Sequence, residues 1–188
     1  MPRRLITFDS GESYHVYNRG NDKQSIFKEI ENYRFFLKQL VKYLPKNTIQ
    51  VLAYTLMPNH YHLLLRMMKS FDVSKAMKDF SISYVKAMNN RYGKVGHLFQ
   101  GEFKAKHVDS AEYLLHLSRY IHMNPVFANL VPKPDQWEFS SYSDYLGSTK
   151  IGITNTNFIL SHFEDVGDYR AFVEGLTSSE YGKIEHSL

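Results

Sequence analysis

Residues 48–67 read TIQVLAYTLMPNHYHLLLRM, and this stretch decides the fold. The runs at 48–56 and 60–67 are rich in β-branched, aromatic and aliphatic side chains, a composition typical of strands. Residues 57–59, Met-Pro-Asn, separate the two runs and have the chemistry of a short turn. The stretch therefore predicts a β-hairpin.

The sequence on either side of this hairpin predicts further elements. Tyrosine and valine at 12–19, followed by Gly-Asn-Asp, indicate a strand that ends in a turn. Apolar residues that recur at three- and four-residue steps predict amphipathic helices at 26–43 and 72–91. A loop punctuated by glycines then leads to a strand at 103–108.

A third helix is expected to start at Asp109, which forms a capping-box-like pair with Glu112, and to end before Pro125. Beyond it, 137–146 is expected to be a short packed segment and 168–175 a small terminal helix. The order strand, helix, strand, strand, helix, strand, helix predicts an α+β fold. We expect an antiparallel sheet of the ferredoxin-like or RRM-like kind with helices packed on it.

The composition narrows the class of protein. Of 188 residues, 43% are hydrophobic and 22% charged, as in ordinary globular proteins. No cysteine is present, which excludes a disulfide scaffold, a thiolate zinc site and a cysteine nucleophile. The net charge of +4 permits a polyanionic partner without establishing one. No apolar run is long enough to span a bilayer, and the first residues lack a signal-like stretch, so we expect a cytoplasmic protein with no membrane partner.

His60 and His62 lie two residues apart in the second strand of the hairpin and should project from the same face of the sheet. Neutral imidazole is a good ligand for a divalent metal, and two such ligands leave positions open for a third group, water and substrate. The alternative is a pair of half-exposed sheet histidines that bind no metal.

Tyr120 and Asn124 lie one helical turn apart and should face the same side of the third helix. A phenol could act as nucleophile beside a metal that the amide helps to bind. The alternative is structural: Tyr113, Leu117 and Tyr120 would form a core stripe, and Asn124 would be a helix terminator.

Several motifs together resemble a known family: YHVYNRG at 14–20, MPNHYHLLL at 57–65, GHLFQGEFKA at 96–105, YIHMNPV at 120–126 and WEFSSY at 137–142. In this order and spacing they resemble the single-tyrosine HUH transposases, particularly the REP-associated tyrosine transposases. HUH denotes histidine, hydrophobe, histidine. The matched motifs fall within a domain that we place at residues 1–146, and we expect 147–188 to be a C-terminal extension.

The resemblance implies roles for individual residues. His60 and His62 would be metal ligands, Tyr120 the nucleophile and Asn124 the third ligand, a position that is often Gln in the insertion-sequence relatives. The metal would be Mg²⁺ or Mn²⁺, and attack by Tyr120 on single-stranded DNA would give a 5′-phosphotyrosine and a free 3′-hydroxyl. No ATP or other nucleotide cofactor would be needed. The family also implies DNA transposition at hairpin, palindromic or REP elements and, in a bacterium, association with the nucleoid.

Residues outside this constellation are candidates for DNA contacts because of their charge or hydrogen-bonding groups: Arg19, Arg66, Gln100, Lys104 and Lys106. For each of them a solvated or packed side chain is the alternative. The sequence also leaves open whether a homodimer forms and whether Tyr120 serves its own chain or a partner.

Two other functions are consistent with the same residues. One is a metal-dependent hydrolase in which the histidine site activates water and Tyr120 is structural. The other is a non-catalytic protein, derived from a transposase, that binds nucleic-acid hairpins.

Overall fold

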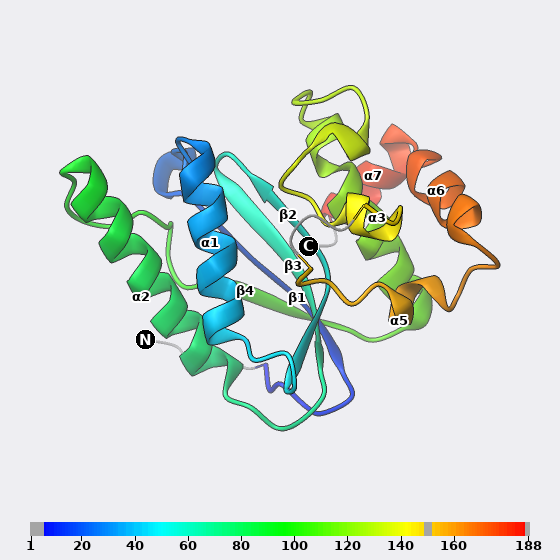
Figure 1. Ribbon diagram of the computed structural model, residues 1–188, viewed down its shortest axis with the longest axis horizontal. Coiled ribbons are helices and arrows are strands. Elements are labelled where there is room, and N and C mark those ends of the chain that lie inside the picture. Colours follow the sequence, from blue (N-terminus) through cyan, green and yellow to red (C-terminus); the bar gives the residue numbers. More distant parts are fainter. Residues whose placement is uncertain (1–5, 149–151, 187–188) are drawn as a thin grey trace.

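The computed structural model describes residues 6–148 and 152–186, and its centre is a four-stranded sheet (Figure 1). Every neighbouring pair of strands is antiparallel, and the order across the sheet is β2-β3-β1-β4. This order and the βαββαβ sequence of elements are those of the ferredoxin-like unit, so the predicted α+β class is confirmed. The strands are β1 (Ser13–Arg19), β2 (Ile49–Met57), β3 (His60–Met67) and β4 (Lys104–Val108).

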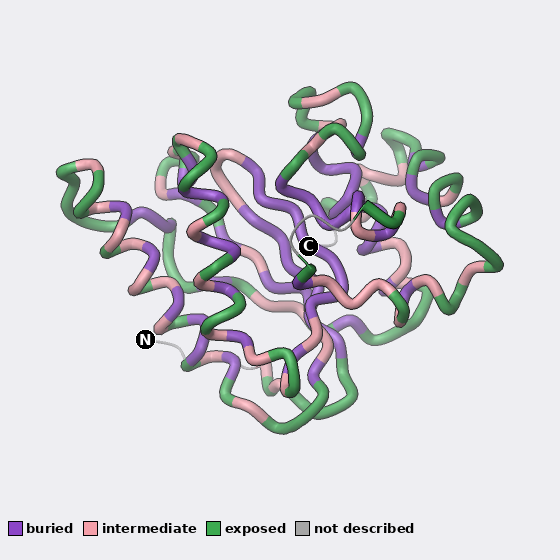
Figure 2. The backbone as a smooth tube through the Cα atoms, viewed as in Figure 1, coloured by how far each residue is buried: buried purple, intermediate pink, exposed green. Residues whose placement is uncertain are grey.

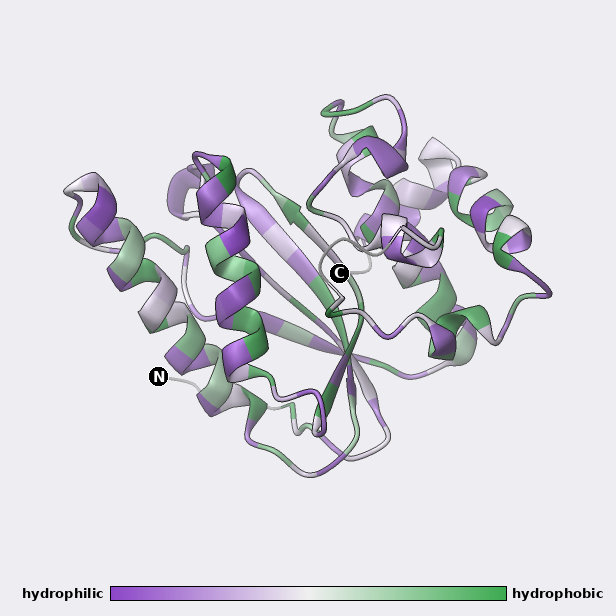
Figure 3. Ribbon diagram, viewed as in Figure 1, coloured by the Kyte–Doolittle hydropathy of each residue, from purple (hydrophilic) through white to green (hydrophobic). Residues whose placement is uncertain are grey.

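Helices α1 (Ile30–Tyr43) and α2 (Val73–Tyr92) cover one face of the sheet (Figure 1). Both carry alternating hydrophobic and hydrophilic bands, as an amphipathic helix requires (Figure 3). The first helix was expected from Ile26, but it begins at Ile30. Its predicted first turn is not helical, because the backbone N–H groups of Ile26 and Phe27 donate to the Pro58 carbonyl of the hairpin turn.

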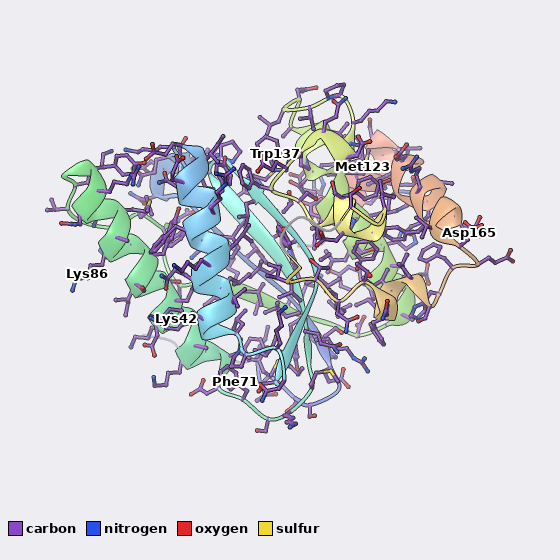
Figure 4. The ribbon with its side chains drawn as sticks, viewed as in Figure 1. Lys42, Phe71, Lys86, Met123, Trp137 and Asp165 are labelled. Carbon is purple, nitrogen blue, oxygen red and sulfur yellow. The ribbon has the colours of Figure 1, made fainter. Side chains whose placement is uncertain are left out.

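The other face of the sheet is covered by α3 (Ala111–Phe127) and the C-terminal segments, and Figure 2 shows the strands between the two layers as mostly buried. Side chains of β3 therefore enter two cores in alternation: Tyr61, Leu63 and Leu65 pack toward α1 and α2, whereas Leu64 packs toward α3. Figure 4 places Lys42 and Lys86 on the α1/α2 side and Met123 and Asp165 on the α3 side.

The elements on this second side run from α3 to the last described residues. They are α3 (Ala111–Phe127), the short helix η2 (Pro134–Gln136), α4 (Tyr142–Tyr145), α5 (Asn157–Leu160), α6 (Val166–Glu174) and α7 (Ser178–His186). One further short helix, η1 (Asn21–Lys23), follows β1. The predicted terminal helix corresponds to α6, and the structure adds α7 after it. No helix in the described part of the chain is long and apolar enough to cross a membrane.

Both predicted ends of α3 were wrong. Ser110, not Asp109, is the N-cap, and its hydroxyl oxygen accepts a hydrogen bond from the Tyr113 N–H at 3.2 Å. At the other end the helix continues through Pro125 to Phe127. A proline there removes a single helical hydrogen bond, and the next turn is closed by the Ala128 N–H, which donates to the Asn124 carbonyl at 2.9 Å.

Candidate functional site

The strand register puts both histidines of β3 on the face that α3 covers. His62 pairs with Tyr17 of β1 and His60 with Arg19, so these side chains share a face of the sheet. The two imidazole rings have centroids 5.0 Å apart and are perpendicular, at 89°. His62 is buried and His60 is half-buried.

Helix α3 brings Tyr120 and Asn124 to the same place. The Tyr120 ring meets the His62 ring edge to face, with centroids 5.6 Å apart, and Asn124 Oδ1 lies 3.5 Å from His60 Nε2. All four side chains come from one chain, although they are separated by about sixty residues of sequence. Tyr120 also belongs to the core between α3 and the sheet, so its packing and its place beside His62 are compatible.

The hydrogen bonds around His60 and Asn124 leave two acceptor atoms facing each other. Asn59 Nδ2 donates to the Lys23 carbonyl, so its Oδ1 is the atom that faces His60 Nδ1, at 2.7 Å. That contact places the proton of neutral His60 on Nδ1 and leaves Nε2 as an acceptor. Asn124 Nδ2 donates to the Tyr120 carbonyl at 3.3 Å, which directs Oδ1 toward His60.

Two acceptors at this separation fit a shared cation. Two ligands that each lie about 2.1 Å from one small divalent ion cannot be more than about 4.2 Å apart. The 3.5 Å between His60 Nε2 and Asn124 Oδ1 satisfies this limit. Among the described residues no three His, Cys, Asp or Glu side chains are arranged to hold a metal, so a site here needs the amide oxygen as a ligand beside the imidazoles.

Burial keeps the two histidines neutral, which is the form that binds metal. Loss of solvent lowers the pKa of His60 to about 4, and the charge of Arg19 lowers it further, while the hydrogen bond that a protonated ring would donate to Asn124 opposes the change. The pKa of His62 is lowered well below its ordinary value, first by burial and then by the neighbouring imidazoles of His15 and His60. At neutral pH neither ring is therefore positively charged.

Tyr120 is not poised for attack in this conformation. Its ring is 3% exposed and stacks on Tyr181 of α7, with centroids 4.8 Å apart. Burial raises the pKa of the Tyr120 phenol, while hydrogen bonds with Asn124 and Tyr181 partly offset this. A nucleophilic phenol needs the opposite shift, which a nearby cation can supply.

Three of the residues suggested for DNA contacts lie near the histidines. Arg19 is exposed at the end of β1 in register with His60, and Lys104 and Lys106 of β4 pair with Tyr17 and His15 on the same face. The ammonium groups of the two lysines lie over aromatic rings, at 6.0 Å from the Tyr17 centroid and 5.1 Å from that of Tyr113. Arg19, Tyr17, Lys104 and Lys106 thus form a basic and aromatic strip along β1 and β4, and Tyr113 of α3 borders it.

The other two suggested DNA contacts lie elsewhere. Arg66 shares the face of His60 and His62, but its guanidinium stacks on Phe158 of α5 at 3.8 Å, so the structure does not bring it to the site. Gln100 is exposed in the loop before β4, where its backbone N–H donates to the Arg19 carbonyl at 2.9 Å.

The sequence did not point to His15 or Asn59 as parts of the site. His15 Nε2 lies 2.9 Å from His62 Nδ1, and Asn59 holds His60 as described above. Asn59 could have been suspected because it directly precedes His60, but the contact of His15 depends on the register between β1 and β3.

Comparisons with known proteins show which family and which fold the chain resembles. The family described as transposase IS200 like matches residues 10–124. A solved REP-associated tyrosine transposase bound to a REP hairpin superimposes with a TM-score of 0.66 and 15% identity, over 82% of this chain and 98% of that one. A candidate transposase from Deinococcus radiodurans R1 gives a TM-score of 0.41 and 14% identity, over 60% and 88%. Curated protein sequences gave no match.

A ferredoxin-like sheet whose central strand carries histidine, hydrophobe, histidine defines the class of HUH tyrosine transposases. Because the family match covers more than half of the sequence, the chain belongs to the IS200-like transposase family.

Proposed function

We propose that this transposase cleaves and rejoins single-stranded DNA through a covalent bond to Tyr120, with a divalent metal held by His60, His62 and Asn124. The facing acceptor atoms of His60 and Asn124, next to the Tyr120 ring, are the observation that best supports this proposal. Mg²⁺ or Mn²⁺ fits a donor set of imidazole nitrogen and amide oxygen. Such an ion, when bound, withdraws charge from the scissile phosphate.

The side chains of this chain account for the remaining steps. Tyr120 must leave its stack on Tyr181 and lose its proton, so that its oxygen can attack the phosphorus in line with the bond that breaks. The phosphorus then becomes bonded to the tyrosine oxygen, and the leaving 3′ oxygen takes up a proton. In rejoining, a 3′-hydroxyl attacks the phosphotyrosine and the phenol is released. The ester conserves the energy of the broken bond, so no ATP is consumed.

The basic and aromatic strip next to the site suits an unpaired strand. Lysines neutralise phosphates, and the half-buried rings of Tyr17 and Tyr113, each with a lysine ammonium over it, supply aromatic surface beside them. We propose that the strand next to a DNA hairpin lies along this strip, with Arg19 near the phosphate at the metal site. The solved relative with a bound REP hairpin supports a hairpin substrate here, and such a substrate would place the protein at the nucleoid.

Covalent attachment to DNA is the measurement that tests the proposal. The purified protein is incubated with Mn²⁺ and labelled single-stranded hairpin DNA taken from the flanks of its own gene, and is then run on a denaturing gel. Wild-type protein should give a labelled protein band that EDTA abolishes. Tyr120→Phe should give no band, because the phenol oxygen is the nucleophile.

Tyr17→Phe is the matched control. Tyr17 also contacts the His62 ring, with centroids 5.9 Å apart, and this variant likewise loses a phenol hydroxyl while it keeps the aromatic ring. It should retain the adduct. An adduct that persists in Tyr120→Phe would refute the assignment. Cleavage of the DNA without any adduct would favour the metal-dependent hydrolase. DNA binding that EDTA does not change, without cleavage, would favour a non-catalytic hairpin-binding protein.

A further inference from the structure

His15 lies in the centre of the sheet and makes one polar contact in the described structure. It belongs to the motif YHVYNRG of β1, its exposed fraction is 0%, and its Nε2 lies 2.9 Å from His62 Nδ1. Its Nδ1 is buried and has no hydrogen-bond partner among the described residues. Burying an imidazole while one of its two ring nitrogens has no hydrogen-bond partner costs free energy of folding. We therefore expect the contact of the other nitrogen with His62 to have a role.

The position of the shared proton decides what His62 can bind. In the pair of neutral rings one hydrogen lies between His15 Nε2 and His62 Nδ1. If it belongs to His62, that ring has its lone pair on Nε2 and can ligate a metal. If it belongs to His15, the proton of His62 is on Nε2 and blocks ligation.

We infer that His15 is a positioning residue that accepts a hydrogen bond from His62 Nδ1 and so presents His62 Nε2 to a divalent metal. The inference rests on the metal site of the proposed function. His60 is held by the same device, because Asn59 Oδ1 accepts from its Nδ1 and is itself oriented by the Lys23 carbonyl. Partners of this kind fix the ring and its tautomer in metal sites.

The geometry separates this role from those of a ligand or a DNA contact. The Nε2 of His15 is engaged by His62, and the ring is stacked between neighbours, with the Tyr17 centroid 4.6 Å away. Because the side chain is fully buried, it cannot touch a DNA strand. Its influence must therefore pass through His62.

Two substitutions of His15 separate the hydrogen bond from the packing. In His15→Gln the side-chain oxygen can replace Nε2 as acceptor, whereas His15→Leu has a similar volume and no acceptor. Titration of Mn²⁺, followed by electron paramagnetic resonance, should show the dissociation constant of His15→Leu raised on the order of 10–100-fold. His15→Gln should stay close to wild type.

Thr55→Val is the matched control. Thr55 is the cross-strand neighbour of His62 on β2, is fully buried, and does not hydrogen bond to the ring. Its Mn²⁺ affinity should equal that of wild type. Urea unfolding of each variant shows whether the fold is retained, and a drop in affinity in Thr55→Val equal to that in His15→Leu would overturn the inference.

A long-range ¹H–¹⁵N spectrum of the metal-free protein reads the tautomer directly. His62 should be protonated on Nδ1 in wild type and His15→Gln, and should shift toward Nε2 protonation in His15→Leu. Nε2 protonation in wild type would overturn the inference. If wild type binds no Mn²⁺ but His62 has the Nδ1 proton, the metal of the proposed function fails, while the control of the His62 tautomer by His15 stands.

Discussion

At the scale of single residues, Asn124 carries the sharpest prediction because its oxygen faces His60 and its nitrogen is already engaged. Asn124→Ala removes the proposed third ligand and should weaken Mn²⁺ binding at least about tenfold, or about 1.4 kcal/mol. Asn124→Asp keeps an oxygen at this position and adds charge, so it should bind Mn²⁺ as tightly as wild type or more tightly. Isothermal titration of both variants measures the difference.

Asn89→Ala serves as the control for Asn124→Ala. It also removes a helix amide that donates to a backbone carbonyl, that of Gly96 at 3.0 Å, but it lies on α2 on the opposite side of the sheet. Its Mn²⁺ affinity should not change. Undiminished affinity in Asn124→Ala would show that the amide is not a ligand.

The sequence predicts which site residues lie together when they are close along the chain, and it does not do so when they are far apart. The period of a strand puts His60 and His62 on one face, and the period of a helix does the same for Tyr120 and Asn124, so both pairs are predictable from local spacing. The two pairs come together only in the tertiary structure. From the sequence, the family resemblance was the one reason to assign them to the same site. The pairing of His15 with His62 depends on strand register, which the sequence does not specify.

At the scale of elements, α7 covers Tyr120. Tyr181 stacks on Tyr120 and on Phe127, and Glu180 accepts a hydrogen bond from the largely buried Arg119 at 2.9 Å. Tyr181→Ala should weaken this cover and raise the rate of DNA adduct formation on the order of tenfold, if the closed state is favoured by about 1.4 kcal/mol. A time course on denaturing gels measures the rate.

Lys183→Ala is the control for this prediction, since Lys183 is exposed on the same helix and should leave the rate unchanged. Adduct formation that is equally fast in Tyr181→Ala and wild type would mean that α7 is not what limits access. A slower rate would mean that Tyr181 supports the reactive position of Tyr120.

The elements that the sequence predicted well are those with strong periodicity, and the misplaced start of α1 has a cause outside its own sequence. Helix α1 starts late because the hairpin turn captures its first N–H groups, a contact between distant segments. Helix α7 escaped prediction because it has few apolar residues, and those it has, such as Tyr181, pack on α3. The importance of α7 comes from its contact with Tyr120, which the pattern of its own sequence does not show.

At the scale of the whole molecule, the buried histidines predict how stability depends on pH. Burial is the first cause that lowers the pKa of each: to about 3 for His15 and His122, to about 4 for His60, and well below its ordinary value for His62. In the unfolded chain these groups titrate near pH 6.5. As the pH falls below 6.5, the unfolded state binds protons that the native state does not, and the free energy of unfolding decreases.

The expected loss is up to about 1.4 kcal/mol per pH unit for each histidine that stays neutral in the fold, between pH 6.5 and about 4. Carboxylates contribute little in the upper part of this window because they titrate below it. Glu180 is one example, since hydrogen bonds from Thr177 and Arg119 lower its pKa to about 2. Urea unfolding in EDTA at pH 7.5, 6.0 and 5.0 should show a midpoint that falls steadily. An equal urea midpoint at pH 7.5 and 5.0 would mean that these imidazoles accept protons in the folded protein as readily as in the unfolded chain. That result would contradict the burial of His15 and His62 against each other in the sheet.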